Sequence, residues 1–146
     1  MKFLIINGPN LNNLGSRDSS IYGSMTLSEI NDYLLRFAND IGVELSFFQS
    51  NHEGDLVDFI QQNTLSSDGI LINAGAITHY GLSLKDAIVD SQLPVVETHI
   101  SNIHSREKFR RTSVLESVSV GQVAGFGWKS YVYALDLLLD YLNSGN

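Results

Sequence analysis

Cysteine is absent from this 146-residue chain, and no apolar stretch is long enough to span a membrane. Without thiols the protein can form no disulfide and can use no thiolate nucleophile, which fits a reducing compartment. A membrane-spanning helix needs about 20 predominantly apolar residues. The apolar run after Lys2 covers four residues, fewer than the ~7–15 of a secretory signal core. We therefore expect a soluble, cytoplasmic protein with no membrane partner.

Basic residues are also scarce, since nine Lys and Arg face 16 Asp and Glu and give a net charge of -7. Such a balance disfavours nucleic acid as a general partner, because clustered basic residues drive that binding. Four of the nine basic residues nevertheless lie in "REKFRR", residues 106–111. This basic cluster is either a solvated helix face or an anion-binding site, and the sequence leaves both interpretations open.

Three motifs of familiar chemistry are missing. The chain has no G-x-G-x-x-G, no H-E-x-x-H and no G-x-S-x-G, which disfavours a dinucleotide site, a zinc-protease site and a hydrolase nucleophile elbow. Single residues that metals favour are present, namely His52, His79, His99, His104 and Glu97. They show no metal-ligand spacing and no second carboxylate cluster, so we expect no metal ion.

Short apolar runs alternate along the chain with segments of helical periodicity. Uninterrupted apolar strands between helices predict a parallel sheet that is covered on both faces. We expect a single domain over residues 1–146, with a three-layer α/β fold of about five strands. "TLSE" at 26–29 is a capping box, and Gly42 ends the helix that it starts. The other expected elements are helices at 53–63, 82–91, 105–111 and after Gly127, and a strand within 117–125.

The segment 131–142, "YVYALDLLLDYL", is apolar at ten of its twelve positions. This is a wide apolar surface for a helix on one side of a small sheet. Two interpretations remain open. The helix packs deeply in its own core, or it shares a face with another subunit.

Polar residues follow every expected strand, and in a parallel sheet these strand ends meet at one edge, where ligands bind. The first strand is followed by a long polar loop that carries Arg17 and Tyr22. On the fourth strand Glu97 and His99 are two residues apart and share a side, so the carboxylate can hold one imidazole nitrogen and leave the other for a substrate. A surface histidine without function fits that pair equally well.

Five motifs in order resemble type II 3-dehydroquinate dehydratase. They are "NGPNLNNLGSRDSSIYG", "QSNHEGDLVDFI", "GILINAGAITHYGLSLKDAI", "LPVVETHISNIHSREKFR" and "VAGFGWKSYVYAL", which together cover nearly the whole chain. The resemblance implies a flavodoxin-like fold with a five-stranded parallel sheet. It also implies a cofactor-independent hydro-lyase of the shikimate pathway, which removes water from 3-dehydroquinate to give 3-dehydroshikimate. The family further implies a homo-oligomer, a dodecamer built from trimers.

The resemblance also assigns roles to matching residues. Tyr22 is implied as the base, Arg17 as its electrostatic activator and Asn10 as the holder of a water molecule beside an enolate. His99 is implied as the acid, and Glu97 orients it. The implied substrate-binding groups are Asn73, His79, the backbone at Ile100 and Ser101, Arg110, and Asp86 from a neighbouring subunit. His52 and Glu53 are assigned to structure.

Elementary electrostatics supports pairing an arginine with a catalytic tyrosine. A free tyrosine ionises near pH 10, so tyrosinate at pH 7 costs about 4 kcal/mol. A guanidinium about 4 Å away supplies on the order of 4 kcal/mol at an effective dielectric constant near 20. Two departures from the family pattern, "RDS" at 17–19 and "AGAITHYG" at 74–81, affect no assigned catalytic residue.

Two other functions deserve comparison. A binding protein could use the same pocket for a carboxylate or nucleotide without chemistry, but it would need neither a base nor an acid on separate loops. A dehydratase that works through a lysine Schiff base in a (β/α)₈ barrel would need a chain of about 250 residues. This chain is too short for that barrel.

Overall fold

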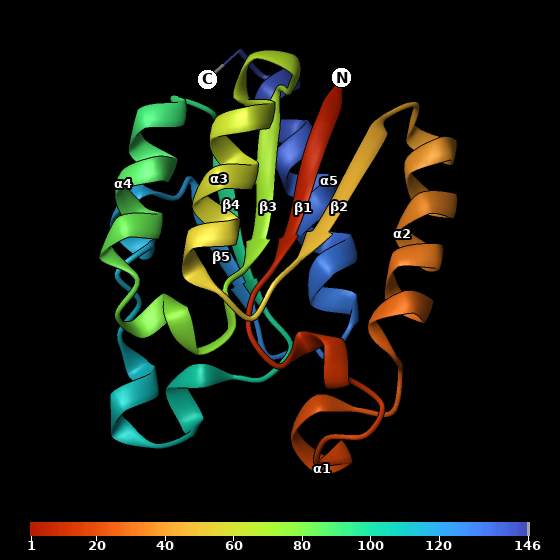
Figure 1. Cartoon of the computed structure of the whole chain (residues 1–146). Coiled ribbons are helices and arrows are strands. Elements are labelled where there is room, and N and C mark those ends of the chain that lie inside the picture. The colour runs from red at the N-terminus through yellow and green to blue at the C-terminus, as the bar shows by residue number, and fades with distance from the viewer. Residues whose placement is uncertain (146) are drawn as a thin grey trace.

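The computed structural model describes residues 1–145, so that residue 146, the last of the predicted domain, lies outside the described residues. Five parallel strands form one sheet in the order β2-β1-β3-β4-β5 (Figure 1). This is the flavodoxin-like strand order. The predicted fold class is therefore confirmed. The strands are β1 (Lys2–Asn7), β2 (Glu44–Gln49), β3 (Gly69–Asn73), β4 (Val95–His99) and β5 (Gly121–Ala124).

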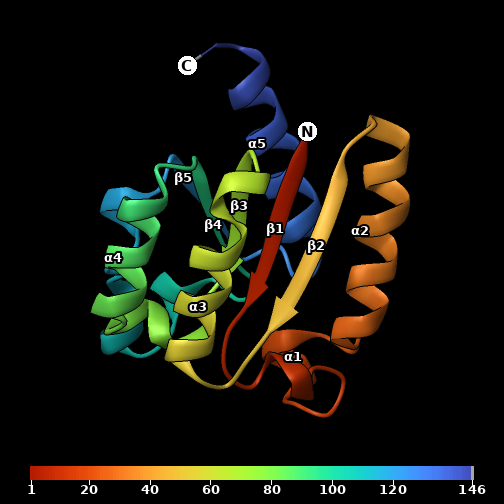
Figure 2. The ribbon, with the colours of Figure 1, turned by 45° about the horizontal axis from the view of Figure 1, so that its top comes forward.

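Helices cover both faces of the sheet (Figures 1 and 2). Side chains in a strand point alternately to the two faces, so β1 supplies both halves of the core. Its Phe3 and Ile5 pack in one apolar cluster, and Leu4 and Ile6 pack in the other. This is why the run "FLII" is apolar without interruption. Helices α2 (Leu27–Ile41) and α5 (Lys129–Asn143) lie over the first cluster, and α3 (Glu53–Asn63) and α4 (Leu82–Ser91) over the second.

Most predicted helix boundaries are confirmed. The Thr26 hydroxyl accepts from the Glu29 backbone N–H, and the Glu29 carboxylate accepts from the Thr26 backbone N–H, which completes the predicted capping box of α2. Gly42 ends that helix with a left-handed φ of 73°, a conformation that glycine adopts at little cost. Helices α3 and α4 occupy the predicted ranges. Within residues 1–145 no helix has the length and apolar character needed to cross a membrane.

Two predicted elements differ from the structure. The expected helix at 105–111 is instead two 3₁₀ turns, Ile103–Ser105 and Lys108–Arg111, because the backbone at Arg106 is extended and interrupts it. The expected strand at 117–125 shrinks to β5. Its first part forms a 3₁₀ turn, with the Val118 N–H donating to the Leu115 carbonyl, and pairing with β4 starts only where the Val120 N–H donates to the Val95 carbonyl at 2.7 Å.

Helix α5 buries one side and exposes another. Tyr131, Leu135 and Leu138 are completely buried in the apolar cluster on one face of the sheet. Tyr133 and Leu137 are 54% and 52% exposed. The helix thus packs in its own core, while a face shared between subunits remains a prediction.

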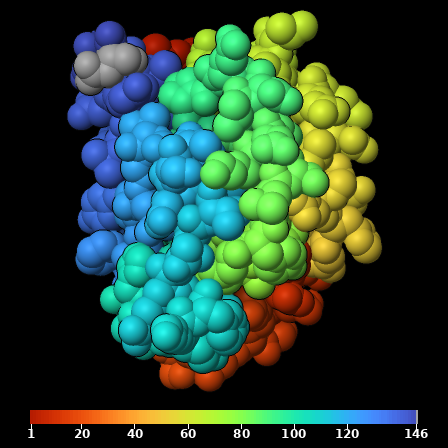
Figure 3. Space-filling model, turned by 90° about the vertical axis from the view of Figure 1, so that its left-hand side faces the viewer, coloured from red at the N-terminus to blue at the C-terminus, as the bar shows by residue number. Residues whose placement is uncertain are grey.

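The carboxyl ends of the strands meet at the lower edge of Figure 1, where the long loops gather. Figure 3 shows the teal segment around residues 100–112 beside the red and orange loop that follows β1. The loops after β1 and β3 touch directly, since a Cβ on Gly8 would lie 2.2 Å from the carbonyl oxygen of Ala74. Only glycine allows this close approach. The two loops therefore lie against each other at the edge of the sheet where a site is expected.

Candidate functional site

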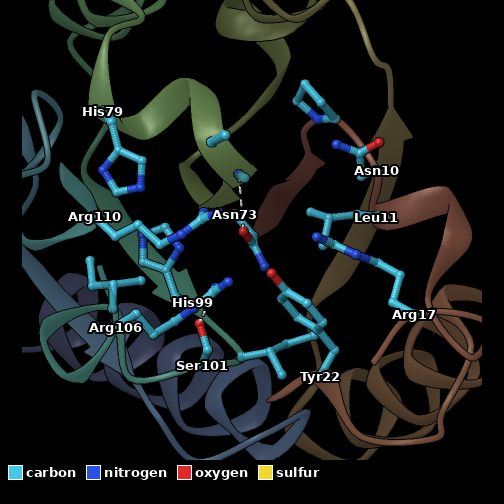
Figure 4. Close-up of a pocket in the computed structure, with 15 residues that line it drawn as sticks. Asn10, Leu11, Arg17, Tyr22, Asn73, His79, His99, Ser101, Arg106 and Arg110 are labelled. Atoms are coloured by element: carbon cyan, nitrogen blue, oxygen red, sulfur yellow. Dashed lines mark hydrogen bonds between the residues drawn. The ribbon is translucent and has the colours of Figure 1, made fainter. Parts of the chain in front are cut away.

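A pocket lies at the carboxyl ends of β1, β3 and β4 (Figure 4). Loops that are far apart in the sequence converge there, as the strand ends predicted. The predicted site residues that line it are Asn10, Arg17, Tyr22, Asn73, His79, His99, Ile100, Ser101 and Arg110. The structure therefore brings nine of the eleven predicted site residues to one pocket. Glu97 and Asp86 are the two that do not line it.

The charge of this pocket is opposite to that of the chain. Three arginines line it, Arg17, Arg106 and Arg110, while its lining includes no Asp, Glu or Lys from residues 1–145. Concentrated positive charge in a concave site attracts small anions even when the whole protein is acidic. Of the basic cluster at 106–111, two arginines line the pocket and Lys108 and Arg111 are exposed outside it. Half of the basic residues in that cluster therefore lie where an anion site would need them, and the other half are exposed to solvent.

Tyr22 lies between two guanidinium groups. The Cζ of Arg17 is 3.8 Å from the centre of the Tyr22 ring, and the Cζ of Arg106 is 5.2 Å from it. Figure 4 shows the Tyr22 ring directed into the pocket, with Arg17 on one side and Arg106 on the other. Two guanidinium groups thus lie beside one phenol ring at the pocket.

Sequence reasoning missed Arg106. Its segment was expected to be a helix, and helical periodicity gives no sign of which basic residue turns inward. In the structure its extended backbone separates two 3₁₀ turns, and its Nη1 donates to the Ser101 hydroxyl at 3.2 Å. The one available signal was the local excess of basic residues in an acidic chain.

A short helix, α1 (Ser19–Tyr22), ends at Tyr22 and had no counterpart in the sequence prediction. Asp18 caps it, because its carboxylate accepts from the Ser20 hydroxyl at 2.6 Å and from the Ser20 backbone N–H at 2.9 Å. Both bonds lower the pKa of Asp18, and the bond from the Ser20 hydroxyl contributes most. The "RDS" departure thus supplies the N-cap of the helix that holds Tyr22.

His99 is held by a buried carboxylate. Glu97 is completely buried, and its Oε1 lies 2.7 Å from the His99 Nε2. Because a carboxylate accepts, Nε2–H is the donor, and Nδ1 is the nitrogen left to exchange a proton. The Ser113 hydroxyl also lies 2.9 Å from both Glu97 oxygens, and the Thr78 hydroxyl donates to Oε1. The predicted Glu97–His99 pairing is present in the structure.

The environment of Glu97 favours its charged form. Burial by itself raises the pKa of this carboxyl, but the bonds from His99, Thr78 and Ser113 and the attraction of the imidazole outweigh burial and lower it. A carboxylate with these donors keeps a negative charge beside the His99 ring.

We expect Glu97 to make stability sensitive to acid. A carboxyl whose pKa is lower in the folded state stabilises the fold above its unfolded pKa, and this contribution is lost as the pH falls through the folded value. The free energy of urea unfolding should therefore fall below pH ~4.5, the ordinary value for glutamate, more steeply in the wild type than in Glu97→Gln. Glu116→Gln, at an exposed position, should keep the wild-type slope. Parallel curves for the wild type and Glu97→Gln would refute this.

Hydrogen bonds also orient the other polar groups of the pocket. The His79 Nδ1–H donates to the Thr112 carbonyl at 2.8 Å, which leaves Nε2 free to accept. Asn10 has a left-handed φ of 68°, and its backbone N–H donates to the Asn51 side chain at 3.0 Å. These contacts hold the His79 ring and the Asn10 backbone at the pocket edge.

Three remaining predictions concern residues outside the pocket. Asp86 is exposed on α4 and does not line the pocket of its own chain. Glu53 accepts from the Leu84 backbone N–H at 3.0 Å and so ties α3 to α4, as expected of a structural residue. His52 is exposed at the start of α3. In the described part of the chain, no three His, Asp or Glu side chains gather as a metal site would require.

Comparison with known proteins identifies close relatives. The family model for "Dehydroquinase class II" matches residues 1–139. A 3-dehydroquinate dehydratase of Prochlorococcus marinus (strain NATL1A) is 53% identical over 97% of this chain and 98% of its own. One from Roseiflexus castenholzii is 51% identical over 99% of this chain and 92% of its own.

A solved structure agrees with these sequence relatives. The crystal structure of type II dehydroquinase from Butyrivibrio crossotus is 43% identical, has a TM-score of 0.93, and covers 95% of this chain and 97% of its own. Fold and sequence similarity thus extend over nearly the whole chain in both directions. The resemblance of the five motifs is confirmed, and the chain belongs to the class II dehydroquinase family.

Proposed function

We propose that this protein removes water from 3-dehydroquinate to give 3-dehydroshikimate, by an anti elimination through an enolate. The observation that carries the proposal is the composition of the pocket. Among residues 1–145, three arginines and no carboxylate line it. A phenol flanked by guanidinium groups and an imidazole held by a carboxylate enter it from different strand ends. The substrate is a polyhydroxylated carboxylate, so its charge suits this pocket. In the family this reaction is a step of the shikimate pathway.

The proposed base is Tyr22 as its phenolate. It takes a proton from C2, and the electrons of the broken C–H bond form the enolate of the C3 ketone. Arg17 and Arg106, at 3.8 and 5.2 Å from the ring centre, stabilise the phenolate electrostatically. Asn10 holds a water molecule that donates to the enolate oxygen.

The proposed acid is His99 as its imidazolium. As the enolate collapses, the C1–oxygen bond breaks, the new C1–C2 double bond forms, and His99 gives its proton to the leaving hydroxyl to make water. Glu97 supports this step because it holds Nε2 and balances the imidazolium charge. The proton that Tyr22 gained then returns to solvent or to His99, which closes the cycle.

The remaining lining residues are proposed to bind the substrate. Arg110 has a planar guanidinium suited to a carboxylate. The backbone at Ile100 and Ser101 and the side chains of Asn73 and His79 provide donors and acceptors for carboxylate and hydroxyl groups.

Mixing the purified protein with 3-dehydroquinate and following the ultraviolet absorbance of the new conjugated enone tests the function. We expect a rate far above buffer. Binding of 3-dehydroquinate without any enone would favour a binding protein instead. Borohydride added with substrate distinguishes the other dehydratase mechanism, because a trapped lysine adduct would overturn the enolate route.

We further propose that the active unit is a homo-oligomer, trimers assembled into a dodecamer. Asp86 is the predicted site residue that its own chain leaves exposed and away from the pocket. The exposed Tyr133 and Leu137 on α5 also suit contact with another subunit. In this arrangement Asp86 completes the pocket of a neighbouring chain.

Subunit mixing tests this arrangement. Asp86→Ala and Tyr22→Phe should each have low activity alone, since every site lacks one group. When the two variants are unfolded, mixed and refolded together, some sites combine an intact Tyr22 with an intact Asp86, so we expect activity above the sum of the two variants. No gain on mixing, or a monomer by light scattering at micromolar concentration, would contradict the proposal.

A further inference from the structure

A buried tyrosine behind the pocket joins three elements of the fold. Tyr131 lies in the first turns of α5 with no exposed surface, and it is not among the residues that line the pocket. Its hydroxyl donates to the Asn7 Oδ1 at 2.6 Å and accepts from the Asn73 Nδ2 at 2.8 Å. Asn7 and Asn73 are paired across β1 and β3 at the ends of these strands. The phenol therefore links α5 to both strand ends at the pocket floor.

The hydrogen bonds of this network run in one direction. The Asn7 Oδ1 can only accept, so it takes the single proton of the Tyr131 hydroxyl. The phenol oxygen then has only lone pairs to offer, and its other partner must be an N–H group. At the far end of the Asn73 amide, the Oδ1 accepts from the Gly75 backbone N–H at 3.1 Å.

This direction fixes which way the Asn73 amide faces. If the amide turned over, its oxygen would meet the phenol oxygen, and its N–H₂ would meet the Gly75 N–H. Both contacts would be repulsive and would leave buried polar groups unpaired. Burial raises the pKa of Tyr131, and the bond from Asn73 opposes this only in part, so the phenol stays neutral and the direction is kept.

The network leaves part of the Asn73 amide available to a ligand. An asparagine amide has two donor hydrogens and two acceptor lone pairs. Once Tyr131 and Gly75 each use one, Asn73 keeps one N–H and one lone pair for a ligand in the pocket that it lines (Figure 4). Within residues 1–145 the buried Asn7 Nδ2 has no hydrogen-bond partner, a cost that an apolar contact at this place would avoid.

We infer that Tyr131 is a positioning residue that presents Asn73 to the substrate in one orientation, with Asn7 setting the direction through the tyrosine proton. The inference rests on the proposed role of Asn73 in substrate binding. Tyr131 itself touches neither the substrate nor the reacting atoms. Its effect on the reaction should therefore appear in substrate binding rather than in turnover.

Tyr131→Phe removes only the hydroxyl oxygen, so the apolar packing of the ring is kept. We expect KM for 3-dehydroquinate to rise about three- to tenfold, the effect of one hydrogen bond lost or misaligned, with kcat changed by less than about twofold. Tyr141→Phe is the matched control, because Tyr141 lies near the other end of the same helix and does not line the pocket. Its KM should equal that of the wild type. A lower Tm with an unchanged KM in Tyr131→Phe would give Tyr131 a merely structural role and overturn the inference.

A double-mutant cycle shows whether Tyr131 acts through Asn73. In an Asn73→Ala background, adding Tyr131→Phe should leave KM where Asn73→Ala alone puts it, because the residue to be positioned is gone. Independent, multiplying effects on KM would overturn the inference. If Asn73→Ala alone leaves KM unchanged, the proposed binding role of Asn73 fails and the inference fails with it. If KM rises in Asn73→Ala but is unchanged in Tyr131→Phe, the inference about Tyr131 is overturned while the proposed binding role of Asn73 stands.

Asn7→Ala provides a second variant if Tyr131→Phe does not fold. It keeps the phenol but frees its proton, so that the hydroxyl can either accept from the Asn73 N–H₂ or donate to the Asn73 oxygen, and only the Gly75 N–H still favours one orientation. We expect KM to rise, but by less than in Tyr131→Phe. A wild-type KM in a folded Asn7→Ala protein would show that the direction of the network does not matter.

Discussion

Tyr22→Phe is expected to lower kcat for the dehydration of 3-dehydroquinate by about 10²–10⁴, the usual contribution of a positioned general base. The phenyl ring keeps its place between Arg17 and Arg106, so the fold and much of the substrate affinity should remain. Only the group that accepts the C2 proton is lost. Enone absorbance at saturating substrate measures kcat, and thermal unfolding checks the fold.

Tyr33→Phe is a close control for this variant. Tyr33 also has a guanidinium over its ring, with the Arg36 Cζ at 5.7 Å from the ring centre, but it packs against Trp128 outside the pocket. Its activity should equal that of the wild type. If Tyr22→Phe keeps more than about a tenth of the wild-type kcat, the loss of kcat is smaller than the loss usual for a general base. Another group would then take the proton.

His99→Ala should also lower kcat by about 10²–10⁴, because the hydroxyl at C1 must then leave without its proton donor. The variant should still bind 3-dehydroquinate, since Arg110 and the other binding groups remain in the pocket. Enone formation gives the rate, and titration calorimetry gives the affinity. The loss is distinct from that in Tyr22→Phe, because the base is intact.

The control for the histidine is His104→Ala. His104 is exposed on the 3₁₀ turn Ile103–Ser105 and does not line the pocket, so its removal should leave kcat unchanged. Loss of substrate binding with unchanged turnover in His99→Ala would make His99 a ligand-orienting group rather than the acid.

Local patterns predicted the parts of the fold that local physics controls. The capping box at Thr26 and Glu29 and the stop at Gly42 gave the bounds of α2, because both signals act within one turn of the helix. The spacing of Glu97 and His99 likewise gave a pair on one side of β4, because strand side chains repeat every two residues.

Contacts between distant segments could not be predicted in this way. Tyr131 and Asn7 are 124 residues apart, and nothing in either neighbourhood indicates the other. The pattern of residues 105–111 suggested a helix. In the structure the backbone at Arg106 is extended and its guanidinium lies near the Tyr22 ring, so local helix propensity did not determine this segment. The whole-chain resemblance to a known family supplied the site assignments that local patterns left open.

The central claim is that Tyr22 removes the C2 proton and that His99, on another strand end, acts only afterwards. Exchange of the C2 hydrogen of 3-dehydroquinate in deuterated water, followed by NMR in the two variants, tests this division directly. In His99→Ala the base still forms the enolate, so solvent deuterium should enter C2 of the remaining substrate faster than product appears. In Tyr22→Phe exchange should not exceed the rate in buffer. Exchange in Tyr22→Phe as fast as in His99→Ala would contradict the account.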